Sequence, residues 1–97
     1  MTHEEINKAV ALELGWSVSK RGWWSKSGYR TEAFAPDFCS DHSAAAIMMN
    51  EIKEDERVRF MSRLWYQLPL ATTFDLVNAS PYVKSVAFLQ IRNLWKG

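Results

Sequence analysis

The pattern of apolar and polar positions predicts a helix at the start of the chain. Over residues 2–14 the apolar side chains recur at helical spacing, at Ile6, Ala9, Val10 and Leu14. Thr2 and Glu5 have the spacing of a capping box, in which the two residues satisfy each other's free backbone N–H groups. Gly15 follows, where helices often end in a left-handed residue.

The next segment predicts extended structure. We interpret residues 16–26 as a hairpin, because two short β-compatible stretches flank Lys20, Arg21 and Gly22. Gly22 can supply the positive φ that a tight turn requires. Residues 29–35 are expected to continue as extended chain, since Pro36 keeps Ala35 out of helical geometry.

A second helix is expected over residues 44–52. Residues 37–41 predict a loop that ends in a helix cap, because Ser40 or Asp41 can accept hydrogen bonds from the first free N–H groups. The alanines of this helix would permit close approach to a sheet, and the charged residues 53–56 would close the helix and turn the chain.

Residues 57–68 alternate between apolar and polar positions, so we predict a β-strand there. One face of this strand would carry the apolar residues Val58, Phe60, Leu64, Tyr66 and Leu68. The other face would carry Arg57, Arg59, Met61, Arg63, Trp65 and Gln67. Residues 71–77 also alternate, and the short connection through Pro69 predicts an antiparallel pair.

The last element is predicted to be a buried helix. Ser80 is a suitable N-cap and Pro81 a suitable first helical residue. From Tyr82 to Trp95 the apolar positions cover so much of the helix that it should be largely buried. Together the elements predict an α+β fold, with a small antiparallel sheet packed with three helices in a layered α/β sandwich. Residues 1–97 have the length of a single domain.

Charge and cysteine content exclude several classes of protein. The formal net charge of +1 lacks both the acidity of a DNA mimic and the basicity of a general duplex-binding protein. Cys39 is the only cysteine, which rules out an internal disulfide and favours a reducing compartment. The first residues lack a signal-peptide pattern, and the longest apolar run, 44–49, is too short for a membrane span. We therefore expect a cytoplasmic protein.

The sequence offers little catalytic chemistry. Cys39, Asp41 and His42 are close neighbours, but a Cys–His nucleophile needs its side chains within hydrogen-bond reach, which neighbours at a helix start rarely achieve. We expect Cys39 to be packed and unactivated. His3 and His42 belong to different elements, and no ligand spacing joins them. We accordingly expect no enzyme, no cofactor and no metal.

Arginine and aromatic residues provide the most suggestive pattern. Arg57, Arg59, Arg63 and Trp65 would share one strand face. This combination is found where sheets bind single-stranded nucleic acid and also in protein interfaces. The alternative is an ordinary solvated face, with Trp65 and Met61 covered by a helix.

Trp23 and Trp24 form a second candidate site. Adjacent residues in a strand point to opposite faces, so both rings cannot enter the same core. We expect one ring to pack inward and the other to face solvent, a helix or a partner, where it could anchor binding.

Four short motifs resemble one known family. They are Leu14-Gly15-Trp16, Gly22-Trp23-Trp24, the segment 35–41 leading into Ala44-Ala45-Ala46, and Ala79-Ser80-Pro81. In these the chain resembles the phage alpha-beta-alpha sandwich domain, a group of small phage and prophage proteins. The resemblance implies a phage origin and a compact fold, and carries no catalytic residues.

The residue patterns and the family resemblance together lead to one expected function and two alternative functions. The expected role is non-catalytic binding to a host protein in the bacterial cytoplasm, with inhibition of a host defence complex as one form. The alternatives are single-stranded nucleic-acid binding through the strand face from Arg57 to Trp65, and a structural homo-oligomer.

Overall fold

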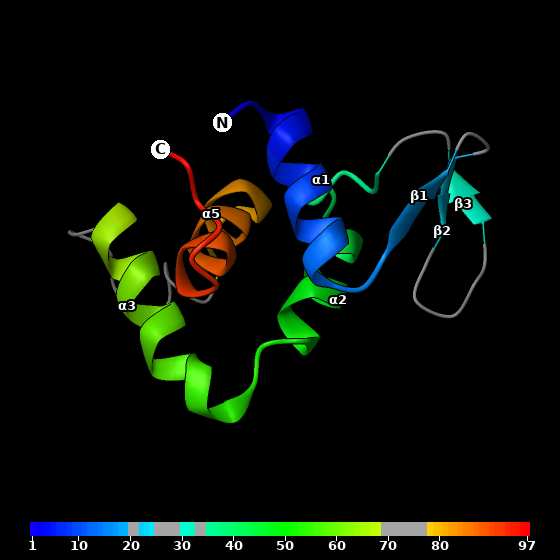
Figure 1. Cartoon of the computed structure of the whole chain (residues 1–97). Coiled ribbons are helices and arrows are strands. Elements are labelled where there is room, and N and C mark those ends of the chain that lie inside the picture. The colour runs from blue at the N-terminus through cyan, green and yellow to red at the C-terminus, as the bar shows by residue number, and fades with distance from the viewer. Residues whose placement is uncertain (20–21, 25–29, 33–34, 69–77) are drawn as a thin grey trace.

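A computed structural model describes residues 1–19, 22–24, 30–32, 35–68 and 78–97. In chain order the elements are α1 (His3–Glu13), β1 (Ser17–Ser19), β2 (Gly22–Trp24), β3 (Arg30–Glu32), α2 (His42–Asn50), the 3-10 turn η1 (Glu54–Glu56), α3 (Arg57–Gln67) and α5 (Pro81–Ile91). The α+β class, with a small antiparallel sheet and packed helices, is as predicted (Figure 1).

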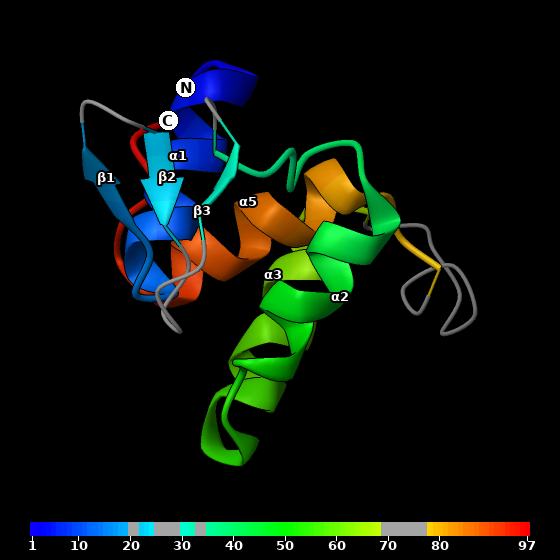
Figure 2. The ribbon, with the colours of Figure 1, turned by 90° about the vertical axis from the view of Figure 1, so that its right-hand side faces the viewer.

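Helix α5 lies at the centre of the packing. Helices α1, α2 and α3 each contact it, with α3 on one side of α5 and α1 and α2 on the other (Figures 1 and 2). Its buried residues face every direction around the axis, and they are Pro81, Ser85, Val86, Ala87, Phe88, Leu89 and Ile91. The predicted N-cap is present, because the Ser80 hydroxyl accepts a hydrogen bond from the Val83 N–H at 3.3 Å.

Helix α1 forms as its sequence predicts. The Glu5 N–H donates to Thr2 Oγ1, and the Thr2 N–H donates to Glu5 Oε1, both at 3.1 Å. Gly15 adopts the left-handed region with φ of 89°. The Trp16 N–H can then turn back and donate to the Ala11 carbonyl oxygen at 3.0 Å, which completes a Schellman end.

The predicted hairpin is also present. Strand β1 pairs antiparallel with β2, and β3 pairs antiparallel on the other side of β2. Val18 lies opposite Trp23, and Gly22 has the positive φ expected of it, at 121°. The sheet lies beside α1, at the end of the molecule away from α3 (Figure 1).

Helix α2 begins at the predicted cap. Asp41 is the N-cap, and its Oδ1 accepts a hydrogen bond from the Ser43 N–H at 2.8 Å. The helix ends at Asn50, so Ile52 enters the core from the segment that follows. The charged segment 53–56 turns the chain, as predicted, through η1.

The strand predicted over residues 57–68 is wrong, because Arg57–Gln67 form helix α3. Phe60 and Leu64 are buried, but Val58 and Tyr66 are 77% and 76% exposed. A separation of four residues is two periods of a strand and close to one turn of a helix, so Phe60 and Leu64 satisfy both patterns. The predicted partner strand, 71–77, and Pro69 lie outside the described residues.

The local sequence favours the helix on two grounds. Arginine, leucine, methionine and glutamine have good helix propensity. Glu54, Asp55 and Glu56 immediately precede α3, where negative charge is favourable to the helix dipole. At the other end, Gln67 Nε2 donates to the Val83 carbonyl oxygen at 3.1 Å, which fastens the last turn of α3 to α5.

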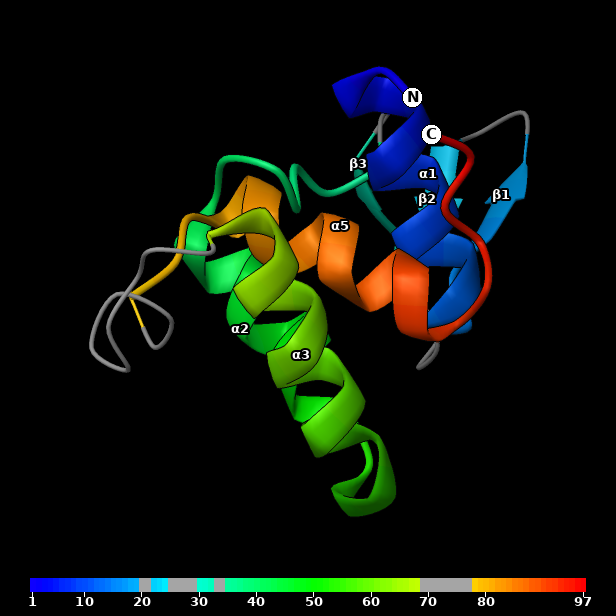
Figure 3. The ribbon, with the colours of Figure 1, turned by 90° about the vertical axis from the view of Figure 1, so that its left-hand side faces the viewer.

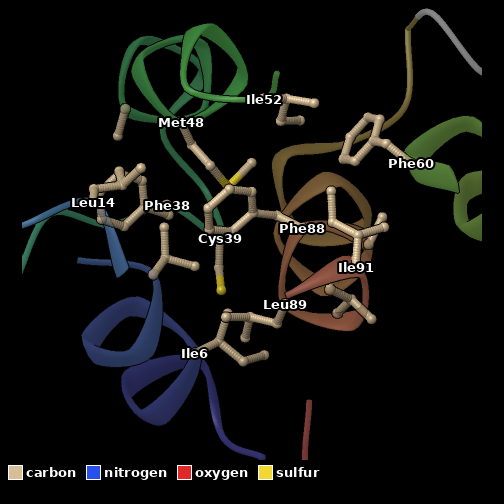
Figure 4. Close-up of a cluster of buried hydrophobic side chains, with 14 of the residues drawn as sticks. Ile6, Leu14, Phe38, Cys39, Met48, Ile52, Phe60, Phe88, Leu89 and Ile91 are labelled. Carbon is tan, nitrogen blue, oxygen red and sulfur yellow. The ribbon is translucent and has the colours of Figure 1, made fainter. Parts of the chain in front are cut away.

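The core is continuous between the helices. Figure 4 shows Phe88 of α5 among side chains from several elements, including Met48, Leu89 and Cys39. Phe60 reaches this cluster from α3 (Figure 4). The one buried hydroxyl of α5, on Ser85, donates to the Phe38 carbonyl oxygen at 2.9 Å, so its burial leaves no unpaired group.

Arg92 joins four parts of the chain at the end of α5. Its Nε and Nη2 donate to both carboxylate oxygens of Glu56, at 2.7 and 3.0 Å. Its Nη1 donates to Glu13 Oε1 at 2.7 Å, and its Nη2 also donates to the Glu51 carbonyl oxygen at 3.2 Å. Helix α5 ends at Ile91, so Leu94 and Trp95 lie beyond the helix and are not part of it as predicted. Between them and Arg92, Asn93 has a positive φ of 58°.

The first prediction concerns the register of α3. Phe60→Ala should lower the free energy of unfolding by about 3 kcal/mol or more, because the ring is 2% exposed and its loss leaves a cavity. Val58→Ala is the matched control and should cost less than about 0.5 kcal/mol. Chemical denaturation measures both. Similar large losses for the two variants would support the strand pattern instead.

The second prediction concerns Glu56, which is 7% exposed. Burial raises the pKa of its carboxyl, but hydrogen bonds from Arg92 and the Lys53 N–H outweigh this and leave the pKa below its usual value. The resulting stabilisation is present above the unfolded-state pKa and is lost as the pH falls through the lower folded-state pKa.

Arg92→Met should therefore cost about 3 kcal/mol at neutral pH, where it leaves a buried carboxylate without its cation. The difference from the unsubstituted protein should shrink as the pH is lowered to about 3, because Glu56 becomes protonated. Lys8→Met removes an exposed pair with Glu4 and is the control that should change little. A difference that does not vary with pH would exclude this account of Arg92.

Candidate binding surface on helix α3

Because residues 57–67 are helical, the side chains predicted to share one strand face lie in two stripes along α3. Residues three, four and seven apart share one side of a helix. Val58, Met61 and Trp65 therefore line up as one stripe, called here the apolar stripe. Arg59, Arg63 and Tyr66 line up beside it as the basic stripe. Figure 3 shows α3 lying on the outside of α5.

The apolar stripe borders a shallow groove of about 430 Å³, lined by Arg57, Val58, Met61, Ser62 and Trp65. Trp65 is 49% exposed and Met61 37%. The alternative in which a helix covers Trp65 is therefore wrong for the described part of the chain. Arg57 and Trp65 share the groove, whereas Arg59 and Arg63 lie on the neighbouring stripe.

The arginines of α3 carry positive charge that is available for binding a partner. Within the described ranges, Arg57, Arg59 and Arg63 form no ion pair with a carboxylate. The Arg63 guanidinium lies 5.8 Å from the centre of the Tyr66 ring, a cation–π arrangement that holds the two together on the surface. This side of the molecule is therefore basic and aromatic.

Sequence reasoning missed Val58 and Tyr66 as surface residues, because the strand pattern assigned both to the core. The signal that could have found Val58 is its spacing to Met61, Ser62 and Trp65, which repeats as three, four and seven. Tyr66 has the equivalent relation to Arg59 and Arg63.

The two tryptophans of β2 do not join this surface. Trp23 is 4% exposed and belongs to the core cluster, so it is the inward member of the pair. The backbone of Trp24 pairs with Ser17 and Arg30, and its side chain lies outside what the structure describes. The candidate residues therefore fall at opposite ends of the molecule.

A second cleft, of about 780 Å³, lies between α1 and the sheet. Its apolar wall includes Leu12, Val18 and Trp23. The charged groups at its edge already have partners within the protein. Lys8 Nζ lies 3.1 Å from Glu4 Oε1, and Asn7 Nδ2 donates to Asp37 Oδ1 at 3.2 Å. The cleft is larger than the α3 groove but has less unpaired charge.

Cys39 is a packed residue, as predicted. It is buried, its N–H donates to Asn7 Oδ1 at 3.1 Å, and its thiol lies 3.8 Å from the His3 carbonyl oxygen. Burial, with a smaller effect from the carboxylate of Asp37, raises the pKa of the thiol to about 11. The thiol is therefore almost wholly protonated at neutral pH.

The two histidines lie in different helices, α1 and α2. His3 packs its ring against Tyr82, with ring centres 4.9 Å apart, while His42 is exposed in the first turn of α2. Among the described residues, no group of three or more histidine, cysteine, aspartate or glutamate side chains could hold a metal ion. Within the same residues, no helix is long and apolar enough to cross a membrane.

Comparison with protein-family models, curated proteins and solved structures finds no match to this chain.

The third prediction concerns Cys39. A cysteine with the ordinary pKa of about 8.5 should react with iodoacetamide at neutral pH at least roughly a hundred times faster than Cys39, because its thiolate fraction is that much larger. Mass spectrometry of the intact protein over time measures the rate. Labelling of Cys39 as fast as that of a free cysteine, in folded protein, would restore the nucleophile hypothesis.

Proposed function

We propose that this protein acts by non-catalytic binding to another protein, through the outer surface of α3. One observation carries the proposal. Seven large hydrophobic side chains are exposed in the described part of the chain, and four of them, Val58, Met61, Trp65 and Tyr66, belong to this single helix. A concentration of exposed apolar groups on one element marks a surface that binds a partner.

The residue types favour a protein as the partner. Tryptophan, tyrosine and arginine are the side chains that contribute most to binding energy at protein interfaces. Val58, Met61 and Trp65 have the spacing with which a helix inserts anchors into an apolar groove. The arginines on either side favour a groove bordered by acidic groups.

Nucleic acid is a weaker alternative now that residues 57–67 are helical. The nucleic-acid hypothesis rested on a flat strand face that would stack bases beside arginines, and α3 offers a convex surface instead. The net charge of +1 also gives little long-range attraction to phosphate.

The resemblance to small phage proteins suggests where the partner is found. On that resemblance we propose that the partner is a protein of the host bacterium's cytoplasm, including a component of a defence complex. This step follows the habits of such proteins, and the residues of α3 specify only the chemistry of the contact.

The fourth prediction tests the surface. Trp65→Ala should weaken capture of the partner from nuclease-treated bacterial lysate by about 2 kcal/mol, because it removes a central aromatic anchor. Replacing Arg59 and Arg63 together with glutamine should slow association and reduce its dependence on salt. Quantitative pull-down identifies the partner, and binding kinetics with the purified partner then give both values.

Leu12→Ala is the matched control, because Leu12 is 55% exposed and lies on α1, which is on the other side of α5 from α3 (Figure 1). It should leave capture unchanged. Capture that survives the α3 substitutions but fails with Leu12→Ala would move the interface to the cleft beside the sheet. Capture that disappears after nuclease treatment would replace the protein partner with nucleic acid.

A further inference from the structure

The cleft between α1 and the sheet is large enough to hold a small molecule. Its volume of about 780 Å³ falls within the range of roughly 300–1,000 Å³ that small-molecule sites occupy. Leu12 and Val18, which form part of its apolar wall, are 55% and 58% exposed. Two large apolar side chains are therefore accessible from one cleft, and a ligand bound there would cover both.

One carboxylate at this cleft has no cation to balance its charge. Lys8 pairs with Glu4, whereas Asp37 forms no ion pair within the described ranges. The partner of Asp37 is a neutral amide, because Asn7 Nδ2 donates to Asp37 Oδ1 at 3.2 Å. Asp37 is exposed and lines the cleft, so a ligand there can reach its carboxylate.

The fold sets the distance between this charge and the apolar wall. The amide of Asn7 is held at both ends, because its Oδ1 accepts a hydrogen bond from the N–H of buried Cys39 at 3.1 Å while its Nδ2 donates to Asp37. Asn7 and Leu12 are five positions apart in α1, which is about 7.5 Å along a helix. This spacing is close to the length of a 2-arylethylamine.

We infer that this cleft binds a small molecule in which a positively charged amine is attached to an apolar ring. The ammonium group would donate to the Asp37 carboxylate, and the ring would pack against Leu12 and Val18. The inference goes beyond the proposed function and does not rest on it, because none of these residues belongs to α3.

The charges of the cleft select an amine over other ligands of the same shape. An anionic ligand would meet the Asp37 carboxylate, and the ammonium group of Lys8 is already paired with Glu4. A neutral ligand would gain the apolar contacts alone. An amine gains both contributions, because a charge-assisted hydrogen bond is stronger than a neutral one.

The test is a titration of the full-length protein with three probes that share a phenyl ring, namely 2-phenylethylamine, 2-phenylethanol and 3-phenylpropionate. The NMR signals of the Leu12 and Val18 methyl groups report binding. The amine should bind with a Kd below about 10 mM, as its size allows. It should bind about fivefold more tightly than the alcohol, and the carboxylate should bind most weakly.

Three variants separate the charge from the apolar wall. Asp37→Asn should remove the preference for the amine, because it removes the charge and keeps an acceptor for Asn7. Leu12→Gln should weaken binding of both the amine and the alcohol by at least about threefold, because it makes the wall polar. Ile47→Gln is the matched control and should change neither, since Ile47 is 54% exposed but lies on α2, outside the cleft.

Each other outcome overturns a stated part of the inference. Methyl signals that do not shift with the amine at about 10 mM would remove the site. Equal binding of the amine and the alcohol, or a preference that survives Asp37→Asn, would remove the role of Asp37. Equal losses with Ile47→Gln and Leu12→Gln would mean unspecific binding to exposed apolar groups. Failure of these titrations would leave the Trp65 capture experiment untouched, and failure of capture would leave the probe result standing.

Discussion

Burial of α5 is the constraint on which the rest of the described structure depends. The helix is apolar almost all the way round, and only complete cover keeps that surface from water. Helices α1, α2 and α3 each contribute one side to this cover. For α3 the contribution is narrow, consisting of Phe60, Leu64 and the end of the helix at Gln67 and Leu68. The remainder of α3 faces outward, so the candidate binding surface is a consequence of how little of this helix the core requires.

The ion pair between Arg92 and Glu56 joins the start of α3 to the end of α5. Glu56 immediately precedes α3, and Arg92 stands at the C-terminal end of α5, where a cation also complements the helix dipole. The same guanidinium reaches Glu13 of α1. One side chain thus links three helices.

Local signals made much of this fold predictable. Thr2 with Glu5, Asp41, and Ser80 with Pro81 each mark a helix start through a backbone N–H that needs an acceptor, and such rules hold wherever the helix later packs. Residues 57–68 were mispredicted because their two core anchors, Phe60 and Leu64, fit either period. The exposure of Val58 and Tyr66 depends on what covers them, which is a tertiary property. The candidate residues of α3 were found from their chemistry, whereas their division into two stripes could be seen only once the segment was known to be helical.

The most direct test of the account is the backbone conformation of residues 57–67 in solution. Multidimensional NMR should give strong amide–amide NOEs between neighbouring residues, small coupling constants between the amide and α protons, and slow amide exchange from Met61 to Gln67, as helical hydrogen bonds require. The Phe60 and Leu64 side chains should show NOEs to α5, while those of Val58 and Trp65 should show none. Strong α-proton to following-amide NOEs with large couplings along this segment would mean a strand, and the proposed α3 surface would then be contradicted.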